Sequence, residues 1–468
     1  MSLLRPRPTT RRLAVLVSAV ALAASTLLLP APVQAGPPGT WSRVLENVAA
    51  TGRSIASARG DDGRLHVVAV GDTSGGKRLT HVTIDRQGRA VLGSESVIVS
   101  GWDAIASTVQ LLPQPGNGLI AYWVGNDPDV AGVNAIWSAS SADGGLTWGA
   151  VSSAFGDTVP NGTDTLSVVA TPGGSSRAGY SDASTVFVDG PAQMPSSFAS
   201  PCGACIDNVT LTALADESVD LTYTLNGGAP GTTGTFTRNV AFWVSDPIKA
   251  PSSSVGGAAS GNQQAVPAVV RGSSVVRAYC VGYPDCDYVG LWAGGTKVVK
   301  VPGSADARNI MLAVDAPGRL WVAWVGSDRI VRAVRTSRTG FTFGALRRLQ
   351  ALPETVDPIG GDAQPTRLDL LAVTDGNVFH QQVLPGLTLR VSPRSFDGDR
   401  RTRVTARATD AGAPVAGVRI SARGARCTTA ANGKCTLTFA PRGPGRLRVS
   451  ATKAGDYAPA TATLRVRS

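Results

Sequence analysis

The sequence predicts an all-β protein in which a β-propeller of seven blades, or of six, precedes a small β-sandwich. Three observations lead to this prediction. No long stretch shows the apolar spacing of a helix, whereas short β-rich runs are broken by Gly, Asp, Pro and Ser. One such run recurs along most of the chain. The composition then changes at residue 385, where arginine becomes frequent.

Residues 1–35 have the pattern of a secretory signal peptide. Four arginines lie within residues 5–12, residues 13–29 are apolar, and the segment ends on Val33-Gln34-Ala35, with small residues at the cleavage positions. A membrane anchor is the alternative, but the apolar run is short for a span. We therefore expect residues 36–468 to be secreted without a transmembrane anchor, either free or associated with the cell wall.

The cysteines form three close pairs. In an exported chain an even number of cysteines with paired spacing predicts local disulfides. The pairs are Cys202 with Cys205, Cys280 with Cys286, and Cys427 with Cys435. A redox or zinc motif at the first pair is the alternative. It would need a βαβ context or a second ligand pair, and the sequence shows neither.

The repeated unit is a strand that ends in Val-Gly at a turn. Four clear copies occur, at residues 64–71, 119–125, 276–282 and 319–326. Residues 320–335 align without gaps with residues 368–383, and diverged copies fit at residues 176–181 and 219–226. The spacing of about 50 residues gives seven units, which is typical of propeller blades. If residues 176–190 are an insertion, the count falls to six.

A second repeat suggests how the ring of blades closes. Residues 146–151 recur as residues 341–346 and again as residues 39–44, ahead of the first unit. We therefore expect the N-terminal strand to complete the last blade, because this removes an exposed sheet edge. The alternative is that Trp41 belongs to an ordinary strand.

One eight-residue motif resembles that of a known family. Ser141, Asp143, Gly145, Thr147 and Trp148 occupy every specified position of the Asp-box pattern. An Asp in such a turn can accept hydrogen bonds from nearby amides, and Gly tolerates positive φ. The motif is similar to that of the sialidase superfamily of propellers, also called BNR-repeat proteins. The resemblance implies a structural marker between the outer two strands of a blade, on the face opposite the active site.

The catalytic residues of that family are not recognisable in this sequence. Its sialidases use an arginine triad for the substrate carboxylate, a tyrosine nucleophile with a glutamate, and an aspartate as acid and base. Arg53 lies in a segment similar to the first arginine motif, but the Ile-Pro that follows in the family is missing. Glu217 is expected in an exposed turn. We therefore assign no catalytic residue, and keep Arg53 as a weakly supported binding residue.

The turns that follow the repeated strands are rich in aspartate. We consider an acidic ring that binds Ca²⁺ or hydroxyl-rich sugars, against the alternative that Asp is a common turn residue. Beyond this Ca²⁺ we expect no cofactor and assign no metal site. Nearby aromatic residues could stack on sugars or belong to the core between blades. The acidic residues are Asp72, Asp127, Asp129, Asp182, Asp285, Asp287, Asp328 and Asp375. The aromatic residues are Tyr122, Trp123, Tyr283, Tyr288 and Trp324.

The charge is divided unevenly along the chain. The net charge of +11 consists of +4 in residues 1–35, −5 in residues 36–384 and +12 in residues 385–468. The last segment alternates apolar residues with outward arginines, which predicts a small sandwich of immunoglobulin-like type. Residues 413–418 and 428–437 resemble bacterial Ig-like and carboxypeptidase-regulatory-like modules. Cys427 and Cys435 flank Asn432-Gly433, so we expect them to staple one hairpin.

The basic C-terminal segment predicts an anionic partner. A cell-wall polymer, an acidic polysaccharide or a phospholipid head group would fit, and nucleic acid is not expected for an exported chain. A merely solubilising surface is the alternative. The function that we expect is a secreted, monomeric, non-catalytic protein that binds a glycan or cell-envelope polymer. An exo-sialidase-type glycoside hydrolase and a structural or adhesive envelope protein are the other candidates.

Overall fold

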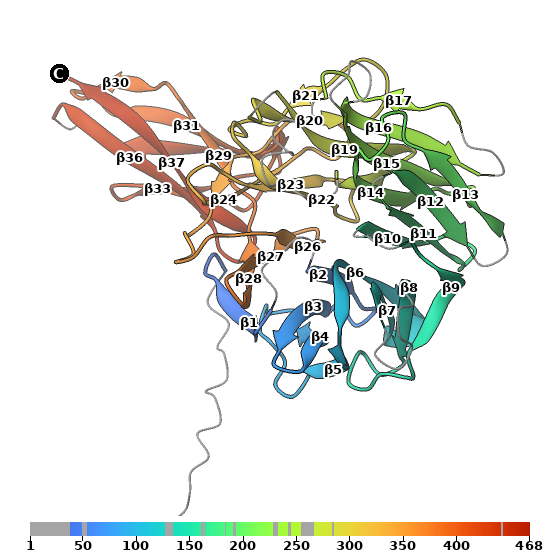
Figure 1. The fold of residues 1–468 in the computed structure, drawn as a ribbon. Coiled ribbons are helices and arrows are strands. Elements are labelled where there is room, and N and C mark those ends of the chain that lie inside the picture. The colour runs from blue at the N-terminus through green and yellow to red at the C-terminus, as the bar shows by residue number, and fades with distance from the viewer. Residues whose placement is uncertain are drawn as a thin grey trace, which may run out of the picture. The chain divides into compact units, whose positions relative to one another are not determined.

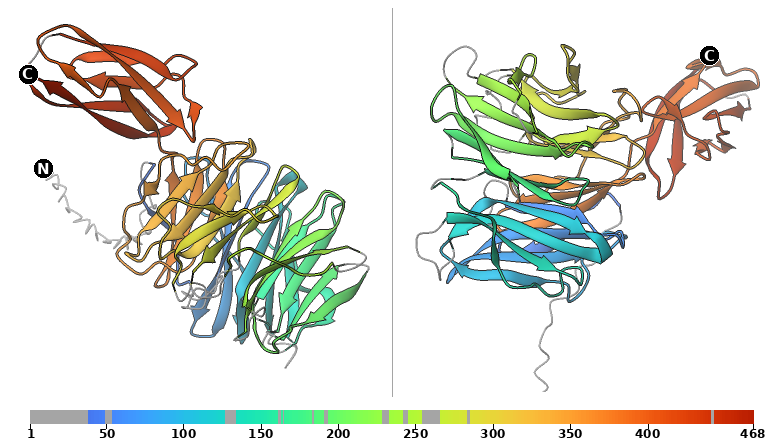
Figure 2. Two further views of the ribbon diagram at one scale, coloured as in Figure 1. Left: turned by 90° about the horizontal axis from the view of Figure 1, so that it is seen from above. Right: turned by 90° about the vertical axis from the view of Figure 1, so that its right-hand side faces the viewer.

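The computed structural model describes residues 38–48, 54–126, 134–160, 163, 165–182, 184–190, 193–227, 233–241, 245–253, 266–282, 285–440 and 443–468 (Figures 1 and 2). In these residues the regular structure is β-strand, apart from one 3₁₀ turn, η1 (Pro115–Asn117). The predicted signal peptide lies outside the described residues.

The strands between residues 42 and 383 form seven antiparallel sheets of four strands each within the described part of the chain. The first three sheets consist of β2 (Ile55–Arg59), β3 (Leu65–Thr73), β4 (Gly76–Ile84), β5 (Ser96–Trp102); β6 (Ala104–Gln114), β7 (Gly118–Asn126), β8 (Asn134–Ser141), β9 (Ser152–Thr158); and β10 (Thr165–Ala170), β11 (Ser176–Ser181), β12 (Thr185–Gly190), β13 (Gln193–Ala199).

The next three sheets consist of β14 (Ile206–Ala213), β15 (Val219–Asn226), β16 (Thr233–Val240), β17 (Ile248–Lys249); β18 (Ala268–Arg271), β19 (Ser274–Val281), β20 (Tyr288–Trp292), β21 (Val299–Lys300); and β22 (Arg308–Val314), β23 (Leu320–Val325), β24 (Val331–Arg335), β25 (Arg347–Arg348). The last sheet contains β26 (Ile359–Ala363), β27 (Leu368–Thr374), β28 (Asn377–Val383) and, from the other end of the chain, β1 (Ser42–Glu46).

One edge strand of each sheet lies innermost, next to the axis. β2, β6, β10, β14, β18, β22 and β26 each contact the next, and β26 contacts β2 again (Figure 1). This arrangement of small sheets around an axis is that of a β-propeller. Residues 176–190, considered as an insertion, contain β11 and β12 of a four-stranded sheet.

The N-terminal strand pairs with the last strand of the propeller, as the repeat of residues 39–44 predicts. Ser42 lies opposite His380 and Glu46 opposite Asn377 in the antiparallel pair of β1 and β28. Trp41 donates a hydrogen bond from its indole Nε1 to the carbonyl of Gln350 at 2.8 Å. The edge of β28 is therefore covered, and the chain closes its own ring.

The repeated strands are apolar because they are buried on both faces. Every residue of β23 and of β27 is buried, so these strands show no alternation of polar and apolar residues. Trp123, Trp321 and Trp324 are among the largest fully buried side chains. Trp102 meets Trp123 and Trp137 edge-to-face at 5.5 Å, a favourable geometry for aromatic rings.

Residues 388–467 form two packed sheets (Figure 2). One contains β29 (Thr388–Ser392), β31 (Thr402–Asp410), β32 (Ala413–Pro414) and β35 (Lys434–Phe439). The other contains β30 (Ser395–Asp397), β37 (Tyr457–Arg467), β36 (Gly445–Lys453), β33 (Arg419–Ala422) and β34 (Ala425–Thr428). Their inward residues, such as Val404, Leu437, Val449 and Leu464, form one core. The sandwich expected from the alternation is thus present.

The disulfide between Cys427 and Cys435 corrects one expectation. Cys427 lies on β34 and Cys435 on β35, and these strands belong to different sheets. The disulfide therefore joins the two sheets and does not staple one hairpin. The turn at Asn432-Gly433 resembles a hairpin signal in sequence, but here it carries the chain from one sheet to the other.

Candidate functional site

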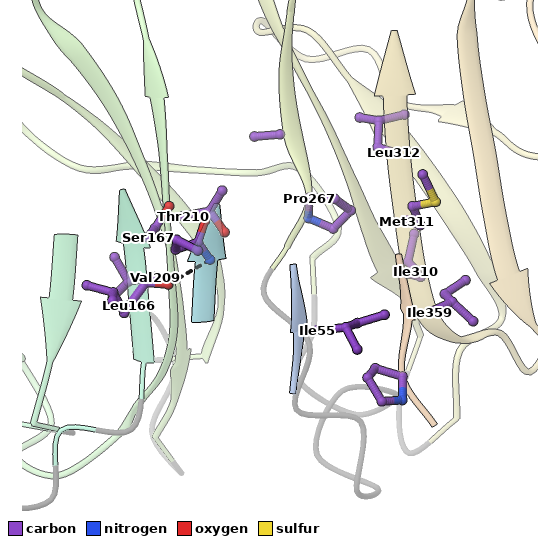
Figure 3. Close-up of a pocket in the computed structure, with 13 residues that line it drawn as sticks. Ile55, Leu166, Ser167, Val209, Thr210, Pro267, Ile310, Met311, Leu312 and Ile359 are labelled. Carbon is purple, nitrogen blue, oxygen red and sulfur yellow. Dashed lines mark hydrogen bonds between the residues drawn. The ribbon is translucent and has the colours of Figure 1, made fainter. Parts of the chain in front are cut away.

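A cavity of about 240 Å³ lies on the axis of the propeller (Figure 3). All seven innermost strands, or the residues just before them, contribute to its wall. The labelled lining residues are Ile55, Leu166, Ser167, Val209, Thr210, Pro267, Ile310, Met311, Leu312 and Ile359. The cavity is small for a ligand pocket and mostly apolar, which favours a packed axis over a sugar-binding cleft.

The polar groups in this wall are engaged within the protein. Gln110 donates a hydrogen bond from Nε2 to the carbonyl of Leu166 at 3.2 Å. The hydroxyl of Ser167 accepts one from the amide of Leu211 at 2.9 Å. The described lining contains no arginine, tyrosine or carboxylate. The described part of the axis therefore does not hold the groups that an exo-sialidase requires.

Of the two residues considered for sialidase chemistry, the structure describes only Glu217. Arg53 lies outside the described residues. Glu217 lies in the turn between β14 and β15 with φ of 66°, as expected for an exposed turn residue. Its Oε1 accepts a hydrogen bond from the amide of Gly173 at 2.6 Å. Through this hydrogen bond Glu217 links the turn between β14 and β15 to the turn between β10 and β11.

The described acidic residues lie in, or at the start of, the turns between the second and third strands of their sheets. Asp72 forms an ion pair with Lys77 across its own turn. Asp328 accepts hydrogen bonds from Arg332 at 2.8 Å and also pairs with Arg348 at 2.9 Å. The hydrogen bond from Arg332 holds the pKa of Asp328 below its usual value. The carboxylates of Asp72 and Asp328 thus form ion pairs with basic residues of their own sheets.

Asp182 accepts hydrogen bonds from the amides of Ser184 and Thr185 at 3.0 and 2.7 Å, which is the turn-capping role of aspartate. Asp285 and Asp287 are exposed on either side of Cys286, and Asp375 is exposed in its turn. Asp127 and Asp129 lie outside the described residues. Among the described residues no three His, Cys, Asp or Glu side chains could hold a metal ion together. The Ca²⁺ ring stays a prediction.

The aromatic residues near these turns are mostly core residues. Tyr122 is 6% exposed, and Trp123 and Trp324 are fully buried, so they offer no ring face to a sugar. Tyr288 is half-buried, with Lys300 Nζ 4.7 Å from its ring centroid. Tyr283 lies outside the described residues. For the three buried residues, the core alternative is therefore the correct one.

The Asp-box forms the turn between β8 and β9, the outer two strands of the second sheet. Asp143 Oδ1 accepts hydrogen bonds from the Thr147 amide at 2.9 Å and the Ser141 hydroxyl at 2.8 Å. The Thr147 hydroxyl donates to Oδ2 at 2.6 Å, and this bond is the main reason that the pKa of Asp143 falls to about 2. This turn lies at the opposite end of the sheet from the acidic turns, because successive strands are antiparallel.

A buried histidine pair supports the Asp-box from the neighbouring sheet. His66 Nδ1 lies 3.1 Å from His81 Nε2, and the two rings are stacked. His81 meets the ring of Trp148 edge-on at 5.6 Å. Gly145 approaches His81 so closely that an added Cβ would lie 2.2 Å from the ring. The box therefore acts as a wedge between the first and second sheets.

Sequence reasoning missed buried charge clusters between sheets, of which two lie within the propeller. Asp220 pairs with Arg277, whose guanidinium carbon lies 5.0 Å from the centroid of Trp292. Asp369 pairs with Arg59 and lies near His380. Each cluster joins strands that are distant in sequence. The only available signal was a charged residue inside an apolar repeat, such as Asp369 within residues 368–374.

The propeller disulfides pair as predicted, Cys202 with Cys205 and Cys280 with Cys286. The remaining candidate surface is the exterior of the sandwich. Across three strands of one sheet, Arg390, Arg407 and Lys434 lie directly opposite one another. On the other sheet, Arg446 lies opposite Arg465. All five side chains are exposed. Such rows of like charge are unfavourable unless an anion lies against them.

No protein-family model matches this chain, and no curated protein matches it. Solved structures with a similar fold include the GH93 α-L-arabinofuranosidase of Fusarium graminearum with arabinobiose (TM-score 0.41, 13% identity, 62% of this chain and 94% of that one). Another is PorZ, a surface component of the type-IX secretion system of Porphyromonas gingivalis (TM-score 0.46, 12% identity, 93% of this chain and 61% of that one).

A third is a lectin of Aleuria aurantia in complex with Fucα1-6GlcNAc (TM-score 0.42, 12% identity, 64% of this chain and 97% of that one). These values are too low to carry an argument about what this chain binds or catalyses. In the described residues there is no helix with the length and apolar character needed to cross a membrane.

Proposed function

We propose that this protein is a secreted, non-catalytic protein that binds glycans or other polymers of a cell surface. In this proposal residues 36–384 form a seven-bladed propeller of the sialidase-superfamily type, and residues 385–468 form a basic Ig-like module. Residues 1–35 direct export, and the mature chain acts as a monomer.

The single observation that carries the proposal is the opposed cations on the sandwich. Arg446 and Arg465 occupy directly opposite positions. Neither of these two arginines forms an ion pair with a carboxylate in the described part of the chain. Guanidinium groups bind carboxylates and phosphates through paired hydrogen bonds. An anionic polymer would therefore provide the negatively charged partners that these arginines lack within the described part of the protein.

The described wall of the axial cavity argues against hydrolysis of the sialidase type. Its described wall consists mainly of apolar side chains such as Ile55, Val209 and Met311. A hydrolase of the sialidase type needs arginines for the substrate carboxylate and a nucleophile beside them. No described residue of the wall supplies either group.

Two measurements on the purified protein test this proposal. We expect no turnover of a fluorogenic sialoside, and salt-sensitive retention on isolated cell envelopes, because exposed charges are screened by salt. Turnover that is lost in Arg53→Ala would overturn the non-catalytic assignment. Absence of binding to envelopes and to a glycan array, with the protein shown to be folded, would overturn the binding assignment.

A further inference from the structure

We propose that the exposed face of the sheet β30–β37–β36–β33–β34 is the docking surface for a linear, carboxylated polysaccharide. This inference rests on the proposed function and names the surface and the chemistry of the partner. We call this surface the arginine face. It is formed by the outward side chains of the five strands, whose inward side chains belong to the sandwich core.

Four arginines form a compact group at one end of the arginine face. Arg446 on β36 lies opposite Arg465 on β37, and Arg448 lies opposite Thr463. Arg467 is two residues beyond Arg465 and therefore on the same face. All four side chains are exposed. Neighbours in this group are about 5 Å apart across the strands and about 7 Å apart along them, measured between Cβ atoms.

The arginine face contains few negative charges of its own. Asp397 on β30 is in register with Arg467, but its carboxylate is 3.2 Å from the guanidinium of Arg400. Arg467 instead donates a hydrogen bond to the hydroxyl of Ser395 at 2.6 Å. Lys453 and Asp456 pair with each other at the far end of β36. Apart from Asp397, which pairs with Arg400, the described part of the arginine face offers these four arginines no counter-charge, and an anion would relieve their mutual repulsion.

Hydroxyl groups continue the rows of the arginine face. Thr463 lies beside Arg448, and Ser450 lies opposite Thr461 in the next row. Ser450 also neighbours Ser421 on β33. Hydroxyls donate and accept hydrogen bonds with sugar hydroxyls, whereas guanidinium groups bind carboxylates. A surface that offers both groups in adjacent rows favours an acidic polysaccharide over a bare polyphosphate or a lipid surface.

The shape also fits a polymer. A hollow of about 830 Å³ at the end of the sheet is lined by Ser395, Arg446, Arg465 and Arg467, among other residues. The two central strands are long, β36 with 9 residues and β37 with 11. An extended chain lying along them meets several cations in succession, so its binding is strengthened by multiple contacts.

The opposite sheet supplies a control of equal charge. Its exposed residues Arg390, Arg403, Arg407 and Lys434 also number four cations. Arg390, Arg407 and Lys434 lie in register on β29, β31 and β35, and Arg403 lies opposite Thr438. A fourfold variant on each sheet removes the same net charge from the protein. Any difference between the two variants therefore reports the location of the binding surface and not the total charge.

The test measures binding of immobilised polygalacturonate by the full chain at low and high salt, with dextran as the neutral polymer. Of these two polymers, we expect the protein to bind polygalacturonate and not dextran. The variant Arg446→Ser/Arg448→Ser/Arg465→Ser/Arg467→Ser should weaken it at least about tenfold, and the control Arg390→Ser/Arg403→Ser/Arg407→Ser/Lys434→Ser by less than about threefold. Equal losses, or a larger loss in the control, would overturn the arginine face as the site while leaving the proposed function intact.

Polyphosphate, single-stranded DNA and vesicles containing phosphatidylglycerol form the other arms. Tighter binding to any of them than to polygalacturonate would overturn the carboxylated polysaccharide as partner. If the unmodified protein binds neither these polymers nor cell envelopes, the proposed function falls as well. The double variant Arg446→Ser/Arg465→Ser gives a second test should the fourfold variant not fold. It should weaken binding several-fold without lowering the melting temperature, because it removes two opposed like charges.

Discussion

Arg59 donates a hydrogen bond from Nη2 to Asp369 Oδ2 at 2.7 Å, although 310 residues separate them in the sequence. Arg59 ends the innermost strand of the first sheet, and Asp369 lies on the second strand of the last. The side chain of Asp369 is only 3% exposed. Burial alone would raise the pKa of Asp369, but the hydrogen bond from His380 and the nearby arginines hold it below its usual value. The pair therefore joins the two ends of the ring.

Replacing one member of this pair should be costly. We expect Asp369→Ala to lower the free energy of unfolding by about 1–3 kcal/mol, because Arg59 loses its more deeply buried carboxylate partner and keeps only Asp362. Equilibrium unfolding in urea measures the change. Asp397→Ala is the control, because Asp397 and Arg400 form an exposed pair whose loss should cost less than about 1 kcal/mol. Equal effects of the two substitutions would contradict the closing role of Asp369.

The histidine pair should make the protein sensitive to acid. Burial lowers the pKa of His81 to about 3 and also lowers that of His66. The unfolded chain binds these protons near pH 6.5, whereas the folded state does not, so stability falls as the pH falls below about 6.5. Because of His81 alone, the free energy of unfolding should decrease by about 2 kcal/mol from pH 7 to pH 5.

Melting temperatures measured across this pH range test the prediction. The variant His81→Gln removes the titrating group and should flatten the dependence, whatever its effect on stability at neutral pH. An unchanged slope in that variant would show that His81 does not control the loss of stability in acid.

Two adjacent glycines of the Asp-box allow a matched comparison. Gly144 and Gly145 both have positive φ, 74° and 84°, so alanine is strained at each position. An added Cβ at Gly144 would lie 3.7 Å from His66, but at Gly145 it would lie 2.2 Å from His81. We expect Gly144→Ala to cost about 1 kcal/mol and Gly145→Ala at least about 2 kcal/mol more. Thermal unfolding measures both, and equal losses would argue against close packing of the box on His81.

The N-terminal strand offers a test of ring closure. Leu45 on β1 is 3% exposed, whereas Arg43 on the same strand is exposed. Leu45→Glu would bury a charge and should detach β1 from β28, leaving an open edge. We expect faster proteolysis of residues 38–46 and self-association in size-exclusion chromatography. Arg43→Ser should change neither the rate of proteolysis nor the state of association. If β1 also detaches in this control, the strand is held by weak pairing with β28 and not by the burial of Leu45.

The fold was predictable because its signals are local or periodic. The copies of the Val-Gly strand identify the second strand of several sheets, and the Asp-box fixes one outer turn from eight consecutive residues. The hydrogen bonds of Asp143 span only four residues, so their pattern is contained in the motif itself.

Contacts between distant segments were not predictable in the same way. A single sequence gives no signal that Arg59 and Asp369 form an ion pair, because their contact depends on how the ring of sheets closes. The disulfide of Cys427 and Cys435 was wrongly placed within a hairpin, since a short turn can also connect two sheets. Trp324 could not be assigned to the core or to a ligand surface until its burial was known.

The last sheet combines β1 with strands from the other end of the propeller sequence, and this determines when the propeller can close during synthesis. β1 is made first and its partner β28 last, with 330 residues between Glu46 and Asn377. At a synthesis rate of about 5–20 residues per second, the first strand waits roughly 15 s to 1 min for its partner to leave the ribosome. During that interval the growing chain has no closed ring, and its hydrophobic first strand must be kept from other partners. Completion of the propeller therefore requires the chain to be synthesised through β28, whereas the strands of the sandwich follow later in the sequence.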